Sequence, residues 1–219
     1  MDKDNTFRSS SFFMEVGDVL HVLIGDVDND TLSLYLVNSS DLVEYAYSLR
    51  ECDIVITTTK IGQVSLYLKG AGYVSVEWGD GDVSADYLHA DDYVRFLHTY
   101  TAGGTITIKN SSHITDIGVA GNNVTSIIIP TEIVAITTCD LEVNDLTTFD
   151  YNVGWTVMHD LLLSDNSLTE ASVNSILVNA DTSGITSGTI DLELNAAPTG
   201  AGLVAKANLI AKGVTVFTA

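Results

Sequence analysis

Basic residues, cysteines and prolines are all scarce in this sequence. It has 9 Lys and Arg against 29 Asp and Glu among its 219 residues, and its formal net charge at pH 7 is -20. Nucleic acids and anionic membrane surfaces are bound by clustered Lys and Arg, so the composition argues against both partners. No apolar run reaches the roughly 20 residues of a membrane-spanning helix. The sequence therefore predicts a folded acidic protein that binds neither nucleic acid nor membrane.

The few cysteines and the lack of known catalytic motifs argue against a metal, a cofactor or catalysis. Cys52 and Cys139 belong to no CxxC or Cys/His cluster, so we expect free thiols and neither a zinc site nor a disulfide framework. The sequence contains no GxSxG nucleophile elbow, no Walker loop and no HExxH motif. We therefore predict that the protein is not an enzyme. A hydrolase with two separated carboxylates is the alternative, because sequence does not give the distance between them.

Much of the chain alternates between apolar and polar residues, as strands do. Only Pro130 and Pro198 interrupt a sequence rich in Val, Ile, Thr, Tyr and Ser, which suits a half-buried pleated surface. The predicted strands are residues 19–24, 31–37, 54–58, 64–68, 73–78 and 105–108. Residues 28–30 read Asp-Asn-Asp, so we expect a hairpin between the first two strands.

Helical spacing occurs in two places near the C-terminus. Thr169 and Thr199 can each cap a helix, and Gly213 can end the second one. The predicted elements are helices over residues 170–180 and 200–212, followed by short strands over residues 189–194 and 214–217. This alternation of helix and strand predicts an α/β cap on a chain that is otherwise mainly β.

An internal repeat precedes this cap. The pattern LxxLxLxxNxL, with conservative apolar replacements, occurs at residues 114–124 and 158–168, and partial copies start at residues 124, 133 and 146. In such a repeat each LxxLxL forms a short strand and the Asn side chain bonds backbone groups at the bend, so that successive coils stack. The sequence therefore predicts a short solenoid with a buried apolar column of Ile114, Ile117, Val119, Val124, Met158, Leu161, Leu163 and Leu168.

Two stretches of the chain resemble known families. Residues 74–81 read VSVEWGDG, residues 98–100 read HTY and residues 104–108 read GTITI. Together they resemble the polycystic-kidney-disease (PKD) type of immunoglobulin-like domain, although Ile106 stands where an aromatic residue is usual. The repeats and the closing residues 188–216 look like leucine-rich repeats in surface proteins of gut Bacteroidales and of phages that infect them. The resemblance extends from about residue 54 to the C-terminus.

The resemblance implies a mainly β fold in which an immunoglobulin-like (PKD-type) sandwich is followed by a short leucine-rich-repeat solenoid with an α/β C-terminal cap. The predicted domains are an N-terminal β attachment region (residues 1–50), a PKD-like domain (residues 51–110) and a leucine-rich-repeat domain (residues 111–219). The resemblance makes His98 a framework residue. It implies adhesion or scaffolding as the role of the protein, and fold alone does not decide between them.

The N-terminus bears on where such a protein would act. Residues 1–13 contain no apolar stretch typical of an export signal. The resemblance then implies a bacteriophage virion protein, such as a capsid decoration, a head fibre or a tail-associated protein, assembled in the host cytoplasm and displayed on the virion surface. Residues 1–50 would attach it to other virion proteins, and a homo-oligomer is expected. The alternative is a bacterial cell-surface adhesin or glycan-binding lipoprotein whose leader is missing from this sequence.

The distribution of charge limits the possible ligands. Residues 110–205 include twelve Asp or Glu and no Lys or Arg. Such a surface repels anionic polysaccharides but permits neutral glycans or a basic host surface protein as partners; alternatively, the charge only keeps copies soluble and apart. Aromatic rings that stack on a sugar would be needed for glycan binding. Tyr151 and Trp155 are the predicted binding residues, since Gly154 interrupts the repeat between them, with packing in the core as the alternative.

Two acidic clusters have both a calcium-binding and a structural interpretation. Asp80 and Asp82 could bind a hard cation, but we favour a tight turn in which Asp80 accepts hydrogen bonds from local amides. Asp26, Asp28 and Asp30 have the first spacings of a calcium loop, yet that loop lacks its turn glycine and its bidentate Glu. We predict no metal site.

Overall fold

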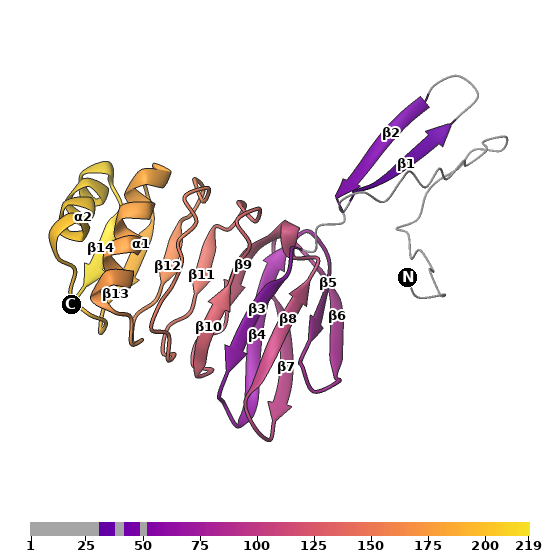
Figure 1. Ribbon diagram of the computed structural model, residues 1–219, viewed down its shortest axis with the longest axis horizontal. Coiled ribbons are helices and arrows are strands. Elements are labelled where there is room, and N and C mark those ends of the chain that lie inside the picture. Colours follow the sequence, from indigo (N-terminus) through magenta and orange to yellow (C-terminus); the bar gives the residue numbers. More distant parts are fainter. Residues whose placement is uncertain (1–30, 38–41, 49–51) are drawn as a thin grey trace. The chain divides into compact units, whose positions relative to one another are not determined.

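The computed structural model describes residues 31–37, 42–48 and 52–219 (Figure 1). The chain divides into two units, residues 1–50 and residues 51–219. In the first unit, β1 (Thr31–Val37) and β2 (Leu42–Ser48) form an antiparallel pair. The predicted strand at residues 31–37 is therefore confirmed. The predictions for residues 19–24, for the hairpin at residues 28–30 and for the cluster of Asp26, Asp28 and Asp30 lie outside the described residues.

The second unit begins with an antiparallel sheet of five strands. Their order in the sheet is β10-β3-β8-β5-β6. The strands are β3 (Ile54–Thr58), β5 (Gly72–Glu77), β6 (Val83–Leu88), β8 (Gly104–Lys109) and β10 (Val124–Ile128). In β3 and β8 every second residue is buried, as the alternation in the sequence predicts. Ile54, Ile56, Ile106 and Ile108 thus enter the core from this sheet.

A second sheet of seven strands has the order β14-β13-β12-β11-β9-β4-β7. It is antiparallel from β7 (Val94–Tyr100) through β4 (Gly62–Gly70) to β9 (Ile114–Gly118), with the short 3-10 helix η1 (Ser111–His113) before β9. From β9 onward it is parallel, through β11 (Thr138–Asp140), β12 (Asp160–Leu162), β13 (Thr189–Leu192) and β14 (Thr215–Thr218). Because β4 pairs with β9 and β3 with β10, both sheets cross the predicted domain boundary at residue 110.

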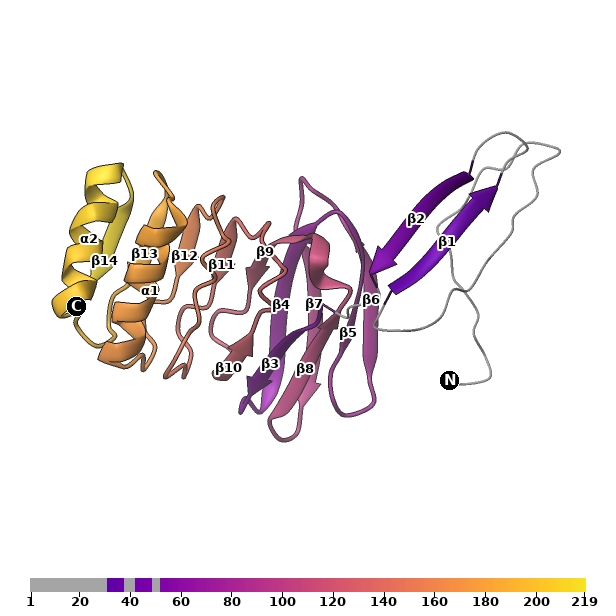
Figure 2. The ribbon, with the colours of Figure 1, turned by 45° about the horizontal axis from the view of Figure 1, so that its top comes forward.

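The described part of the chain is mainly β, as predicted (Figure 2). Its parallel strands stack in register. Ile117 lies opposite Cys139, Cys139 opposite Leu161, and Leu161 opposite Ile190, and all four side chains are buried. The predicted apolar column is confirmed, since Ile114, Ile117, Val119, Val124, Met158, Leu161, Leu163 and Leu168 are each at most 3% exposed.

Four asparagines, Asn122, Asn144, Asn166 and Asn195, form an asparagine ladder that joins successive coils. The amide oxygen of Asn144 accepts hydrogen bonds from the backbone N–H groups of Asn122 (3.0 Å) and Val124 (2.9 Å) in the preceding coil. Asn166 does the same for the N–H of Leu146 at 3.0 Å. Their side-chain NH₂ groups donate to carbonyl groups of their own coil and of the preceding one. The ladder thus satisfies buried backbone groups where the chain leaves each strand.

The two helices follow at the positions that their capping residues predict. Helix α1 is Glu170–Ser183 and α2 is Gly200–Lys212. The Thr169 hydroxyl accepts a hydrogen bond from the amide of Ser172, whereas the Thr199 hydroxyl donates to Glu170 Oε1 instead of accepting one from its helix. Gly213 ends α2 with a positive φ of 103°. Among the described residues, neither helix is long and apolar enough to cross a membrane.

Candidate functional site

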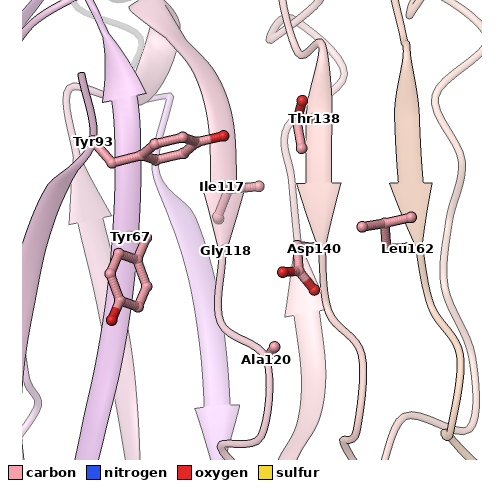
Figure 3. A pocket seen from close by; sticks show the side chains of 8 residues that line it. All are labelled: Tyr67, Tyr93, Ile117, Gly118, Ala120, Thr138, Asp140 and Leu162. Atoms are coloured by element: carbon pink, nitrogen blue, oxygen red, sulfur yellow. The ribbon is translucent and has the colours of Figure 1, made fainter. Parts of the chain in front are cut away.

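The seven-stranded sheet turns one row of side chains away from the core, and a pocket lies in this row. Since strand residues alternate in direction, the neighbours of the buried Ile117, Cys139 and Leu161 point to the opposite face. The resulting pocket, which we call the tyrosine groove, has a volume of about 460 Å³. It is lined by Tyr67, Tyr93, Ile117, Gly118, Ala120, Thr138, Asp140 and Leu162 (Figure 3).

Gly118 opens the space between the two sides of the groove. Tyr67 of β4 lies opposite Gly118 of β9, and Gly118 lies opposite Asp140 of β11. A Cβ atom at position 118 would lie 3.5 Å from the Tyr67 Cβ and 4.0 Å from the Asp140 Cβ, which is ordinary contact. Packing therefore does not require glycine at this position. Because glycine has no side chain, it leaves free surface between Tyr67 and Asp140.

Two tyrosines form one side of the groove. Tyr67 is 38% exposed and Tyr93 is 47% exposed, so both rings are accessible to a ligand. The guanidinium carbon of Arg95 lies 5.4 Å from the centre of the Tyr67 ring, and Lys69 Nζ lies 5.7 Å from the centre of the Tyr93 ring. These cation–π contacts hold the rings in place. The two rings thus present an ordered aromatic surface.

The groove also contains two hydrogen-bonding groups, the Tyr93 hydroxyl and the Asp140 carboxylate. The Tyr93 hydroxyl donates to Asp116 Oδ1 at 3.3 Å, and burial together with the Asp116 charge raises the pKa of Tyr93. Asp140 Oδ1 accepts a hydrogen bond from the Glu142 amide at 3.3 Å. A carboxylate offers about four acceptor positions, so Asp140 can accept further bonds from ligand hydroxyl groups. The groove therefore combines rings for stacking with an acceptor for hydroxyls.

The environment of Asp140 predicts a change of stability with pH. Burial raises the pKa of the Asp140 carboxyl from its ordinary value of 3.8, and the Glu142 charge adds to the increase. We expect Asp140→Asn to raise the free energy of unfolding at pH 7 by less than about 1 kcal/mol, because it removes a charge that folding disfavours. The gain should be complete above the raised pKa of folded Asp140 and disappear as the pH falls toward 3.8. Urea denaturation at several pH values measures it, and a gain independent of pH would contradict this cause.

Tyr151 and Trp155 do not form a binding surface, so the prediction that they bind sugar is wrong. Their exposed fractions are 4% and 0%, and their rings pack edge to face with centres 5.3 Å apart. Trp155 Nε1 donates to the Ile133 carbonyl at 2.6 Å, and the Tyr151 hydroxyl donates to the Trp155 carbonyl at 3.3 Å. Because the polar atoms of both rings find partners inside the protein, burying these side chains costs little. The irregular repeat around Gly154 turns its rings inward.

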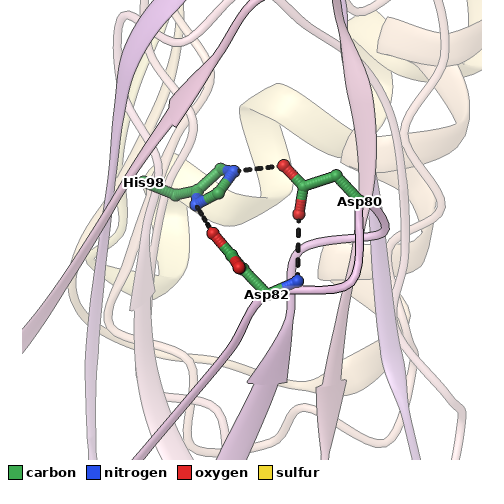
Figure 4. A group of neighbouring side chains, drawn as sticks. All are labelled: Asp80, Asp82 and His98. Atoms are coloured by element: carbon green, nitrogen blue, oxygen red, sulfur yellow. Dashed lines mark hydrogen bonds and ion pairs between the residues drawn. The ribbon is translucent and has the colours of Figure 1, made fainter.

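A group of Asp80, Asp82 and His98 lies at the turn between β5 and β6 (Figure 4). Asp80 Oδ1 accepts the Asp82 amide at 3.2 Å, which confirms the predicted turn interaction. That bond, followed by contacts with His98, lowers the pKa of Asp80. His98 Nε2 lies 2.7 Å from Asp80 Oδ2 and its Nδ1 lies 3.8 Å from Asp82 Oδ2. The two nitrogens of the His98 ring thus face different carboxylates, whereas a metal ion would bind only one of these two nitrogens.

Aromatic side chains pack against the same turn and hold it in place. The His98 ring stacks on Trp78 with ring centres 4.9 Å apart and an interplanar angle of 15°. The Tyr100 hydroxyl donates to the Trp78 carbonyl at 2.6 Å, and Trp78 Nε1 donates to Ser84 Oγ at 2.9 Å. Although Asp80, Asp82 and His98 carry ligand atoms within 4.8 Å of one another, their contacts are those of a framework turn.

No family model, no curated protein and no solved structure matches this chain. The tyrosine groove is therefore interpreted from its own chemistry. Sequence reasoning did not find it, because its residues come from β4, β9, β11 and β12, from the turn after β9 and from the segment before β7. One signal was present in the repeat. The residue after the buried strand position is Gly118 in the first coil but Asp140 and Leu162 in the next two, so the first coil lacks a side chain there.

Proposed function

We propose that the protein is a non-enzymatic binding protein of a bacteriophage virion surface that uses the tyrosine groove to bind a neutral glycan. The observation that carries the binding role is the pair of exposed rings, Tyr67 and Tyr93, across a glycine gap from Asp140. Sugar rings stack on aromatic faces, and their hydroxyl groups donate to carboxylates. Anionic sugars are disfavoured because the acidic surface repels them.

The proposal includes a finer description of the fold. Residues 51–110 would form a PKD-like sandwich whose two sheets β9 and β10 extend, and residues 111–219 a short leucine-rich-repeat solenoid with an α/β cap. The packing of His98 and Tyr100 around the WGDG turn supports the first part. The parallel strands, joined by the asparagine ladder, support the second. The likeness to surface proteins of phages and of Bacteroidales is what favours display on a particle.

Binding without catalysis fits the composition of the groove. Glycoside hydrolysis uses two carboxyl groups on either side of the scissile bond. Asp140 is the one acid among the residues that line the groove in the described part of the chain. Incubation with neutral oligosaccharides, followed by mass spectrometry of the products, tests this point. Released fragments would contradict a purely binding role.

The binding role predicts a loss of affinity when a groove ring is removed. We expect Tyr67→Ala to weaken binding to a neutral oligosaccharide selected from an array by about fivefold, since the stacking of one ring contributes about 1 kcal/mol. Isothermal titration calorimetry gives the dissociation constants. Tyr73→Ala is the matched control, because Tyr73 is 69% exposed but lies outside the groove. Equal losses in both variants, or no binding by the unaltered chain, would refute the glycan role.

The virion location needs a separate experiment. Mass spectrometry of purified phage particles should detect the protein if residues 1–50 attach it to other virion proteins. Recovery from a bacterial surface, with a lipid-modified cysteine encoded upstream, would contradict the virion location and favour the adhesin alternative. The two outcomes leave the groove experiment unaffected, since glycan binding is compatible with either location.

A further inference from the structure

The parallel sheet ends in a strand whose outer edge is open. Within the described residues, β14 pairs with β13 and with no other strand. The Thr215 amide donates to the Gly188 carbonyl at 2.8 Å on the β13 side. Since backbone groups alternate in direction along a strand, the amides of Val216 and Thr218 face the open edge. Such an edge can accept another strand.

Helix α2 lies at the same end of the sheet as β14 (Figures 1 and 2). Leu209 and Ala205 point into the core, whereas Leu203, Val204 and Ile210 are each more than half exposed. Neighbouring exposed aliphatic side chains on one helix mark an interaction surface. We call β14 and the exposed face of α2 the C-terminal edge.

The C-terminal edge differs in charge from the rest of the chain. Residues 194–219 contain Lys206 and Lys212 but no Asp or Glu, in a chain with a net charge of -20. Lys212 Nζ lies 2.5 Å from Asp181 Oδ1, and Lys206 Nζ donates to the Thr218 hydroxyl at 2.7 Å. Elsewhere, two approaching copies would bring carboxylates together and repel each other. At the C-terminal edge that repulsion is absent.

We propose that the C-terminal edge binds a second copy of this chain as a two-fold dimer. A two-fold rotation about an axis that passes through the open edge at right angles to the sheet places β14 antiparallel to the β14 of the second copy and sets the two α2 helices beside each other on the same face. One operation thus covers both open features, as the self-complementary interface of a two-fold dimer requires. Because this edge is near neutral, two copies of this acidic chain can meet here without the repulsion between carboxylates that opposes their contact elsewhere.

Analytical ultracentrifugation of the full chain across a dilution series tests this proposal. The double variant Leu203→Glu with Ile210→Glu puts two carboxylates from each copy into the interface, so the mass should fall to half that of the unaltered chain. The control variant Ile61→Glu with Val157→Glu makes the same change of charge at two other exposed aliphatic residues, and its mass should not change. Circular dichroism checks that both variants fold.

A third variant separates the strand from the helix. Thr218→Pro removes an N–H group that faces the open edge and leaves the bonds from β14 to β13 intact, so it should also weaken the dimer. An unaltered chain that is monomeric at every concentration overturns the proposal. It is also overturned if the mass is the same with and without the Leu203 and Ile210 changes, or if the control variant dissociates equally.

Discussion

Replacing Trp155 by alanine should lower the free energy of unfolding by about 4 kcal/mol. The indole is completely buried and packs against Tyr151 and Phe149, so its removal leaves a cavity in the wide coil before β12. The Ile133 carbonyl would also lose the hydrogen bond from Trp155 Nε1. Urea denaturation followed by circular dichroism measures the change.

Trp155→Phe separates the two contributions. Phenylalanine fills part of the cavity but cannot donate to Ile133, so we expect a loss of about 2 kcal/mol. In the absence of urea, where both variants are folded, they should bind the same glycans as the unaltered chain, because Trp155 does not line the tyrosine groove. A variant that kept full stability but lost glycan binding would restore the discarded role of Trp155 as a sugar-stacking residue.

The elements that could be predicted are those whose signals are local in the sequence. The ends of α2 follow from Thr199 and Gly213, and the buried column follows from the spacing of residues such as Ile117 and Leu161. Strand β7 was not predicted, because Arg95 and His98 interrupt its apolar pattern and its pairing with β4 stabilises it instead. Strands of three residues, such as β11, are too short to show alternation.

The candidate site could not be predicted, because it depends on register. Tyr67 and Gly118 face each other only because β4 pairs with β9 in one particular alignment, and a shift of one residue would turn Tyr67 into the core. Trp155 illustrates the opposite difficulty. An aromatic residue beside a glycine in an irregular repeat has the same sequence signature whether its ring faces solvent or fills a coil that has no helix to cover it.

The second large effect is expected from the asparagine ladder, at Asn144. This side chain is 7% exposed and makes hydrogen bonds in two coils. Asn144→Ala leaves the buried N–H groups of Asn122 and Val124 without the partner that Asn144 Oδ1 provides. Each unsatisfied buried group costs about 1 to 3 kcal/mol, so the free energy of unfolding should fall by about 3 kcal/mol. Urea denaturation of the full chain gives the value.

Asn208→Ala is the matched control for the ladder. Asn208 is exposed on α2, where its side chain donates to Asp181 at 2.8 Å, so its truncation should change the free energy of unfolding by less than about 0.5 kcal/mol. Equal effects of the two substitutions would show that water replaces the lost ladder bonds. The expected difference instead means that the coils need an amide at each bend, because only a side chain with both a donor and an acceptor can satisfy the buried carbonyl groups and the buried N–H groups there at once.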